Sequence, residues 1–148
     1  MPMIPPRSQA RRIALQALYQ LDVQGDDFMD LHLVAFLAES HEETAMRELA
    51  LTMIRGAWYF HSHADVWVGR LSAEWTVARM PVVDRSILRL AVWELVHGKD
   101  VPPKVVLDEA IDMAREFSTA ESPAFINGIL DAVYKEHLAH AGKLSHGV

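Results

Sequence analysis

The sequence contains no cysteine and no long apolar run, and each absence excludes a class of protein. Without cysteine the chain has no disulfide framework, no thiolate zinc site and no cysteine nucleophile, which favours a reducing compartment. No stretch approaches the roughly 20 apolar residues of a membrane-spanning helix, and residues 1–6 lack the apolar core of a secretory signal. We therefore expect a cytoplasmic protein without a membrane partner.

The sequence also lacks the short motifs of common enzymes and metal sites. It has no G-x-S-x-G, no Walker loop and no dinucleotide fingerprint. None of the eight histidines forms an H-x-x-x-H pair: His61 and His63 would diverge on a helix, and His137 and His140 fall in a fraying tail. We expect no enzymatic activity, no metal site and no cofactor.

What the chain does have is a local contrast of charge. Its formal net charge is -6, yet the first 21 residues contain Arg7, Arg11 and Arg12 and no acidic residue. Without these arginines the chain holds eleven basic against twenty acidic residues, a formal charge of -9. Because the acidic remainder would repel nucleic acid, any contact with RNA or DNA should be confined to this end of the chain.

The length of 148 residues and the hydrophobic content of 51% fit one folded domain. Apolar residues recur at helical spacing and no segment alternates like a strand, which predicts an all-α fold. We expect about seven helices, near 8–24, 28–40, 41–60, 64–75, 84–97, 104–117 and 122–138. The helix break at Met80-Pro81 predicts two packed helical subdomains, 7–79 and 82–138. The ends 1–6 and 139–148 have little to bury and are expected to be mobile.

Several predicted helix ends have recognisable signals. Ser8 is a good N-cap for the first helix, and Gly25 follows its end. The pair Ser122-Pro123 is typical of a helix start.

The predicted helix 84–97 is apolar on nearly every side. Its narrow polar strip includes Arg85, Arg89 and Glu94. A helix that is hydrophobic almost all round is usually buried, so we expect it at the centre of the fold.

One face of the first predicted helix combines charge, amides and an aromatic ring. Ser8, Arg12, Gln16 and Tyr19 recur at i, i+4, i+8 and i+11, away from an apolar stripe made of Ala14, Ala17, Leu18 and Leu21. Guanidinium groups bind phosphates through forked hydrogen bonds, and glutamine and tyrosine can contact bases, which suits single-stranded RNA. The residues alone favour an ordinary solvated helix face, with RNA binding as the alternative.

A glycine, Gly128, lies in the interior of the last predicted helix, where it costs about 1 kcal/mol relative to alanine. Either a neighbouring backbone packs closely against it or a ligand lies over it. The spacing favours packing, and it also places Phe125 in the core.

Four segments together resemble the transcription antitermination factor NusB family, in its order and at its spacing. They are residues 10–20 (ARRIALQALYQ), 83–95 (VDRSILRLAVWEL), 104–111 (KVVLDEAI) and 122–131 (SPAFINGILD). The resemblance covers nearly the whole chain. It implies a fold of two packed helical subdomains that binds boxA RNA of rRNA leader transcripts together with the ribosomal protein NusE, within an RNA polymerase antitermination complex.

The resemblance also implies roles for particular residues. Those expected to bind RNA are Arg7, Arg11, Arg12, Gln16, Tyr19, Phe125, Asn127 and Gly128. Those expected to face NusE are an exposed strip of Asp84, Arg85 and Arg89, and an acidic face of Asp108, Asp112 and Glu116. Because a ribosomal protein is expected to be basic, these acids would steer NusE toward the complex. If the three arginines hold phosphates, alanine at all three should flatten the salt dependence of RNA affinity and leave helicity unchanged.

Two other functions stay open. One is a protein-binding helical adaptor, perhaps a homodimer, without a role in RNA binding. The other is a stand-alone relative of the RNA-binding domain of rRNA cytosine methyltransferases, against which we count that no cofactor-binding domain follows in this sequence.

Overall fold

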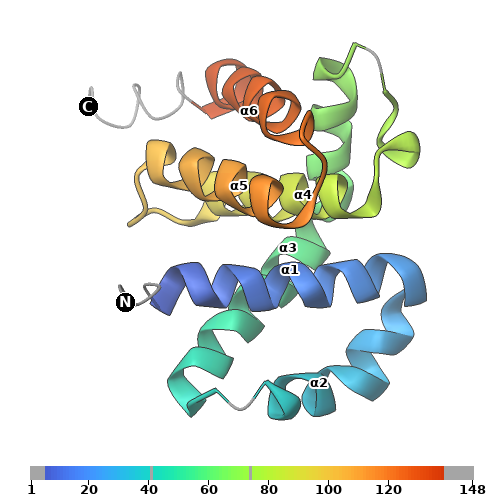
Figure 1. The fold of residues 1–148 in the computed structure, drawn as a ribbon, viewed down its shortest axis with the longest axis vertical. Coiled ribbons are helices and arrows are strands. Elements are labelled where there is room, and N and C mark those ends of the chain that lie inside the picture. The colour runs from blue at the N-terminus through green and yellow to red at the C-terminus, as the bar shows by residue number, and fades with distance from the viewer. Residues whose placement is uncertain (1–5, 41, 74, 139–148) are drawn as a thin grey trace.

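The computed structural model describes residues 6–40, 42–73 and 75–138, and the regular elements in these ranges are all helical. The α-helices are α1 (Pro6–Gln24), α2 (Leu33–Glu39), α3 (Thr44–Leu71), α4 (Val82–His97), α5 (Pro103–Phe117) and α6 (Ser122–Val133) (Figure 1). Short helical turns cover Phe28–His32, Val77–Arg79 and Tyr134–Leu138. The all-α prediction is confirmed. Of the ends predicted to be mobile, residues 1–5 and 139–148 lie outside the described residues.

Two helices that the sequence predicted separately, 41–60 and 64–75, form the single helix α3. Residues 61–63 contain neither glycine nor proline, so nothing in the backbone ends the helix there. Helix α3 packs against α1 and α4 and also contacts α6. Figure 1 shows it running between the part of the molecule that holds α1 and α2 and the part that holds α4, α5 and α6. Because α3 packs against helices of both predicted subdomains, their division stays a prediction.

The predicted signals account for some helix ends and not for others. After α1, Gly25 has a φ of 75° and its N–H donates to the carbonyl of Leu21 at 2.7 Å, as expected of a glycine that ends a helix. Ser8 does not cap α1, because the helix already begins at Pro6. The Ser8 side chain is instead buried and donates its hydroxyl to Glu109 of α5.

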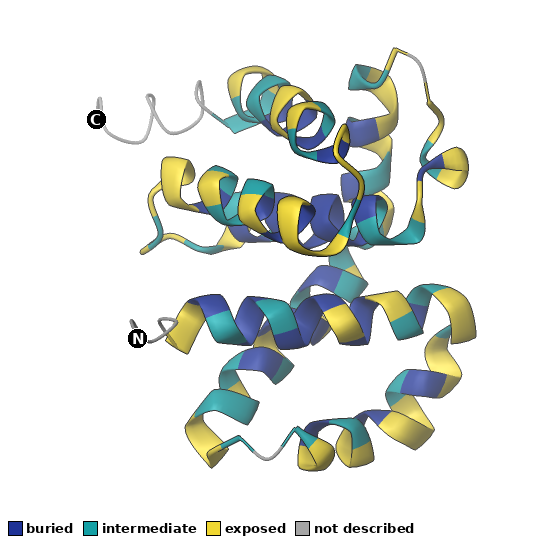
Figure 2. Ribbon diagram, viewed as in Figure 1, coloured by how far each residue is buried: buried dark blue, intermediate teal, exposed yellow. Residues whose placement is uncertain are grey.

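The core is formed by the inward faces of the six α-helices, each of which contributes buried apolar residues (Figure 2). Nine residues of α4 are buried, which confirms its predicted central place. Gly56 permits the close approach of α3 to α4, because a Cβ at this position would lie only 2.3 Å from the ring of Trp93.

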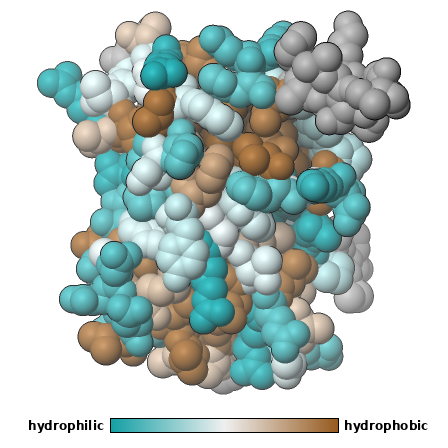
Figure 3. All heavy atoms as spheres, turned by 180° about the vertical axis from the view of Figure 1, so that it is seen from behind, coloured by the Kyte–Doolittle hydropathy of each residue, from teal (hydrophilic) through white to brown (hydrophobic). Residues whose placement is uncertain are grey.

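The surface seen from behind mixes hydrophilic and hydrophobic residues in small patches (Figure 3). Among the described residues, no helix has both the length and the apolar character needed to pass through a membrane.

Candidate nucleic-acid interface

Three of the residues of α1 predicted to bind RNA are exposed, but they lie on two sides of the helix: Arg7 lines a groove with Thr52 and Trp93, apart from Gln16 and Tyr19. Arg7, Gln16 and Tyr19 are all exposed. Gln16 and Tyr19 line a groove of about 330 Å³, together with Leu15, Gln20, Phe36, Val83 and Phe117. Apolar walls with two glutamine amides among them suit a nucleobase, which stacks on a ring and offers a polar edge for hydrogen bonds.

Phe117 is a candidate residue that the sequence analysis missed. It is the last residue of α5, its ring is exposed, and it lines the same groove as Tyr19. Exposed aromatic rings are the usual platforms for unpaired bases. The sequence showed an aromatic residue at the end of the predicted helix 104–117, but nothing in it placed that end beside α1.

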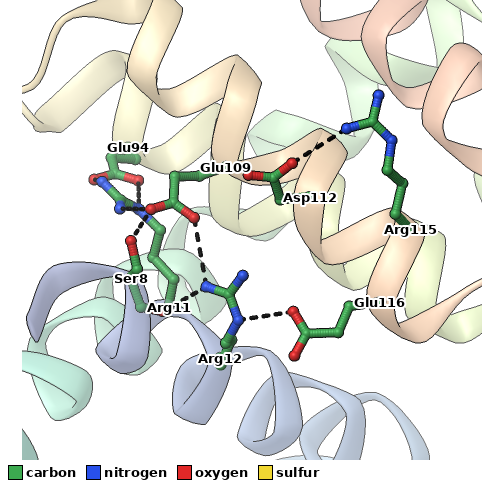
Figure 4. Close-up of polar contacts among 8 residues, drawn as sticks. All are labelled: Ser8, Arg11, Arg12, Glu94, Glu109, Asp112, Arg115 and Glu116. Carbon is green, nitrogen blue, oxygen red and sulfur yellow. Dashed lines mark hydrogen bonds and ion pairs between the residues drawn. The ribbon is translucent and has the colours of Figure 1, made fainter. Parts of the chain in front are cut away.

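Arg11, by contrast, points into the molecule. Only 2% of the residue is exposed. Its Nε and Nη2 donate to the two carboxylate oxygens of Glu94 at 2.8 and 2.7 Å, and its Nη1 donates to Glu109 at 3.1 Å (Figure 4). Since all three nitrogens are engaged by buried or half-buried carboxylates, Arg11 has no free edge for a phosphate. The structure therefore removes Arg11 from the candidate interface, contrary to the prediction.

Arg12 lies on the same helix with its guanidinium nearer the surface. Its Nε donates to Glu116 at 2.9 Å, and its Nη1 donates to the Ser8 carbonyl at 3.0 Å and to Glu109 at 3.4 Å (Figure 4). Arg12 was predicted to bind RNA and Glu116 to face NusE, yet these two side chains touch. The two predicted surfaces therefore meet at this ion pair.

The residues of α6 predicted to bind RNA lie at a second place on the surface. Phe125 is half-buried, and Asn127 and Gly128 are exposed. A Cβ built on Gly128 would meet no atom within 4 Å, so close packing does not explain this glycine. The packing explanation favoured by the sequence is wrong, and the surface over Gly128 is open.

Two grooves adjoin these α6 residues. Asn127 and Arg115 line one of about 470 Å³ between α5 and α6. Phe125, Gly128, Asp84 and Trp75 help to line a larger and more apolar one of about 740 Å³.

Helix α5 lies between the two groups of predicted RNA residues. It packs against α6 on one side, and its Glu109 and Glu116 bond to α1 on the other (Figure 1). Asp108 and Asp112 are exposed on it, and Asp112 accepts a hydrogen bond from Arg115 at 3.3 Å. The acidic face predicted to bind NusE thus separates the α1 and α6 groups, which do not form one continuous patch.

The strip of α4 that was predicted to be exposed is mostly buried. Asp84 is 4% exposed and accepts hydrogen bonds from the hydroxyls of Ser118 at 2.5 Å and Ser122 at 2.9 Å. Arg89 is 9% exposed, and Arg85 is half-buried. The prediction of an exposed strip is wrong because α4 is central, so that its polar residues face neighbouring helices instead of water.

The arginines of that strip belong to an internal ion cluster. Arg89 donates to both oxygens of Asp65 at 2.9 and 2.8 Å and to Asp22 at 2.6 Å. Arg85 also pairs with Asp22, with its Nε at 2.6 Å from the carboxylate. These contacts tie α4 to α1 and α3.

This cluster changes the acidity of its members. For Asp22, burial is the largest single influence and raises the pKa, but hydrogen bonds and the charges of Arg85 and Arg89 outweigh it and hold the pKa below the ordinary 3.8. For Arg89, burial acts to lower the pKa, and the bonds and charges of Asp65 and Asp22 outweigh it and raise the pKa. Both groups are therefore held in their charged forms.

The histidines in the described part of the chain lie beside aromatic rings. His61 stacks on Trp58, and His137 stacks on Trp67 with ring centres 4.4 Å apart, so His137 does not belong to a frayed tail as predicted. His140 lies outside the described residues. Across 6–40, 42–73 and 75–138 no three histidine or acidic side chains cluster closely enough to hold a metal ion.

Comparison with known proteins gives a consistent result. The sequence matches the model of the NusB family over residues 8–135. A transcription antitermination protein NusB from Symbiobacterium thermophilum is 40% identical over 143 residues, which cover 92% of this chain and 94% of that protein. Another from Syntrophus aciditrophicus is 45% identical over 130 residues, covering 86% of this chain and 79% of the relative.

Solved structures with the same fold include NusB of T. maritima. Its TM-score is 0.83 at 37% sequence identity, and the match covers 94% of this chain and 97% of that one. A second is an antitermination factor NusB crystallised with NusE in complex with double-stranded RNA. Its TM-score is 0.79 at 25% identity, over 91% of this chain and 100% of that one.

Proposed function

This chain belongs to the NusB family, and from that membership we propose that it is a transcription antitermination factor that binds RNA together with the ribosomal protein NusE. In this proposal the RNA is the boxA element of rRNA leader transcripts, and the assembly joins RNA polymerase in the cytoplasm to support rRNA synthesis. No enzymatic step is part of the function. The observation that carries the proposal is the likeness, over 91% of this chain, to a NusB crystallised with NusE and RNA.

We place the RNA contact on the outer side of α1. Arg12 provides positive charge for phosphates beside the groove lined by Gln16, Tyr19 and Phe117, which accepts a base, and Arg7 adds charge at the first turn of the helix. Stacking on the two rings supplies affinity for any base, and the glutamine amide can distinguish bases by their hydrogen-bonding edges. Asn127 and Gly128 on α6 form a second, separate contact for RNA, because the acidic face of α5 lies between the two groups.

We place NusE on the second helical half. Asp108 and Asp112 are exposed there and attract a basic partner, which speeds association more than it adds affinity. Asp84 lines the apolar groove beside Trp75, which offers buried contact area to the same partner. Arg85 and Arg89 serve this surface only indirectly, because their guanidinium groups are paired with Asp22 and Asp65.

The test is fluorescence anisotropy with a labelled boxA-type RNA, titrated with the protein in the presence and absence of its cognate NusE. A scrambled single strand and a duplex of the same length are the controls, because the related complex was solved with double-stranded RNA. We expect preference for the boxA single strand, and we expect NusE to strengthen it. Equal binding to all three RNAs, or none with NusE present and the protein folded, would contradict the proposal.

A protein-binding adaptor is the second candidate, and one observation favours it. Of the three N-terminal arginines, Arg11 is buried and Arg12 is paired with acids, which leaves the α1 face less basic than the sequence implied. An adaptor would bind NusE whether or not RNA is present, and the labelled RNA would stay unbound in the titration. A homodimer stays a prediction for either function.

A further inference from the structure

The two neighbouring arginines of α1 differ in how their guanidinium edges are used. Arg11 commits its Nε and Nη2 to both oxygens of Glu94, the forked arrangement that a carboxylate or a phosphate prefers. Arg12 uses only its Nε on this edge, and it contacts a single oxygen of Glu116. Its Nη2 donates no hydrogen bond to any residue in the described part of the chain. Of the Nε and Nη2 edge of Arg12, which could bind a phosphate through two hydrogen bonds, only Nε is therefore occupied.

The partner on that edge is itself near water. The Glu116 side chain is 45% exposed and lies in the last turn of α5, whereas the Arg12 side chain is 14% exposed. Ion pairs with one exposed partner and one hydrogen bond are weak in water. The contact is strong enough to orient the guanidinium and weak enough for another anion to replace.

We propose that Glu116 is an internal competitor for RNA, whose carboxylate occupies the phosphate-binding edge of Arg12 until a backbone phosphate displaces it. This inference rests on the proposed RNA contact of α1. A phosphodiester can accept hydrogen bonds from both Nε and Nη2, where Glu116 accepts only one. Glu116 thereby lowers RNA affinity without blocking the site.

The remaining contacts of Arg12 hold it ready for this exchange. Its Nη1 stays bonded to the carbonyl of Ser8 and to Glu109, on the opposite side of the guanidinium from Glu116. Glu109 in turn is anchored by Arg11 at 3.1 Å. Because the guanidinium keeps these bonds when Glu116 leaves, little new ordering is needed to receive the phosphate.

The test uses anisotropy with the boxA-type and scrambled single strands at low salt. Glu116→Gln keeps the shape of the side chain and removes its charge. The matched control is Asp108→Asn, which removes one charge from the same exposed side of α5 two turns away; all titrations are made without NusE, so the contact proposed for Asp108 does not enter the comparison. We expect Glu116→Gln to bind both RNAs about two- to five-fold more tightly, which corresponds to the loss of one partly exposed ion pair. Because phosphate contacts carry no base information, the ratio between the two RNAs should not change.

A double-mutant cycle identifies the partner. In an Arg12→Ala background, Glu116→Gln should give no more tightening than Asp108→Asn does. The inference would be overturned if Glu116→Gln and Asp108→Asn raised RNA affinity equally in the wild-type background. It would also be overturned if Glu116→Gln still raised RNA affinity more than Asp108→Asn without Arg12. If neither the wild-type protein nor any variant binds RNA, the proposed function fails as well. If the wild-type protein binds and only the difference between the two acids is missing, the inference alone fails.

Discussion

Arg11 and Arg12 are consecutive residues of one helix, yet they belong to different regions of the molecule. Arg11 lies in a buried ion cluster with Glu94 and Glu109, where both oxygens of Glu94 are satisfied. Arg12 lies at the edge of the outer face, with a half-exposed glutamate as its partner. The comparison shows that the number of basic residues in a segment does not measure its capacity for RNA. An arginine can bind a phosphate only if its acidic partner can be displaced from the guanidinium nitrogens.

The largest difference between the two regions should appear in stability. Arg11→Ala leaves Glu94 buried without a counter-charge, so we expect a loss of about 3–5 kcal/mol in the free energy of unfolding. Arg12→Ala removes a partly exposed pair and should cost less, about 1 kcal/mol. Urea denaturation of both variants measures the two losses. Equal losses would mean that the buried ion pair of Arg11 and the outer ion pair of Arg12 contribute equally to the free energy of unfolding.

This expectation also corrects one made from the sequence. Alanine at Arg7, Arg11 and Arg12 together should not leave helicity unchanged, because the triple variant includes the buried Arg11. A variant meant to probe RNA binding must keep Arg11.

The second ion cluster, in which Asp22 pairs with Arg85 and Arg89, should make the stability of the protein depend on pH in acid. The pKa of Asp22 is lower in the folded protein than its ordinary 3.8, so its ion pairs stabilise the fold fully above that value. That stabilisation is lost as the pH falls below 3.8 and through the lowered pKa. Asp22→Asn should therefore be less stable than the wild-type protein at neutral pH, with a smaller further loss in acid.

Denaturation midpoints measured from pH 7 downward test this. The curves of wild type and Asp22→Asn should converge as the pH falls. Curves that stay parallel would show that the charge of Asp22 does not contribute to the fold.

Two glycines extend the comparison to the backbone. Alanine at Gly56 would place its Cβ 2.3 Å from the ring of Trp93 where α3 packs against α4, so it should destabilise the protein. Alanine at Gly128 meets no atom within 4 Å and should stabilise α6 by about 0.5–1 kcal/mol.

Thermal unfolding of the two glycine variants gives the signs of these effects, and RNA titration of Gly128→Ala adds the functional readout. If RNA approaches closely over α6, the stabilised variant should bind more weakly. A variant that is more stable and binds RNA normally would take Gly128 out of the RNA surface.

The sequence predicts the helices better than it predicts the site. Gly25 and the proline residues 81, 103 and 123 mark helix ends in a local way, so the bounds of most helices could be read from the chain. The burial of Arg11 depends on Glu94 and Glu109, which are 83 and 98 residues away, and no local pattern contains that pairing.

One signal for Arg11 was nevertheless present. It stands three residues before Ala14 and seven before Leu18, so it continues the apolar stripe that faces the core. Likewise, Asp84 and Arg89 lie in a helix that is apolar nearly all round, and polar residues in such a helix are buried with partners more often than they are exposed. Phe117 had no such signal, because its place beside Tyr19 depends on how α5 packs against α1.

The measurement that tests the account most directly is the salt dependence of RNA affinity for the double variant Arg7→Ala/Arg12→Ala. These are the two N-terminal arginines that the structure keeps near the surface. Each phosphate contact to a single strand contributes about 0.7 to the slope of log affinity against log salt, so the slope should be flatter by about 1.4. The free energy of unfolding should fall only by the cost of about 1 kcal/mol expected for Arg12→Ala. A slope equal to that of the wild-type protein would contradict the account, because it would leave the outer arginines of α1 without a part in RNA binding.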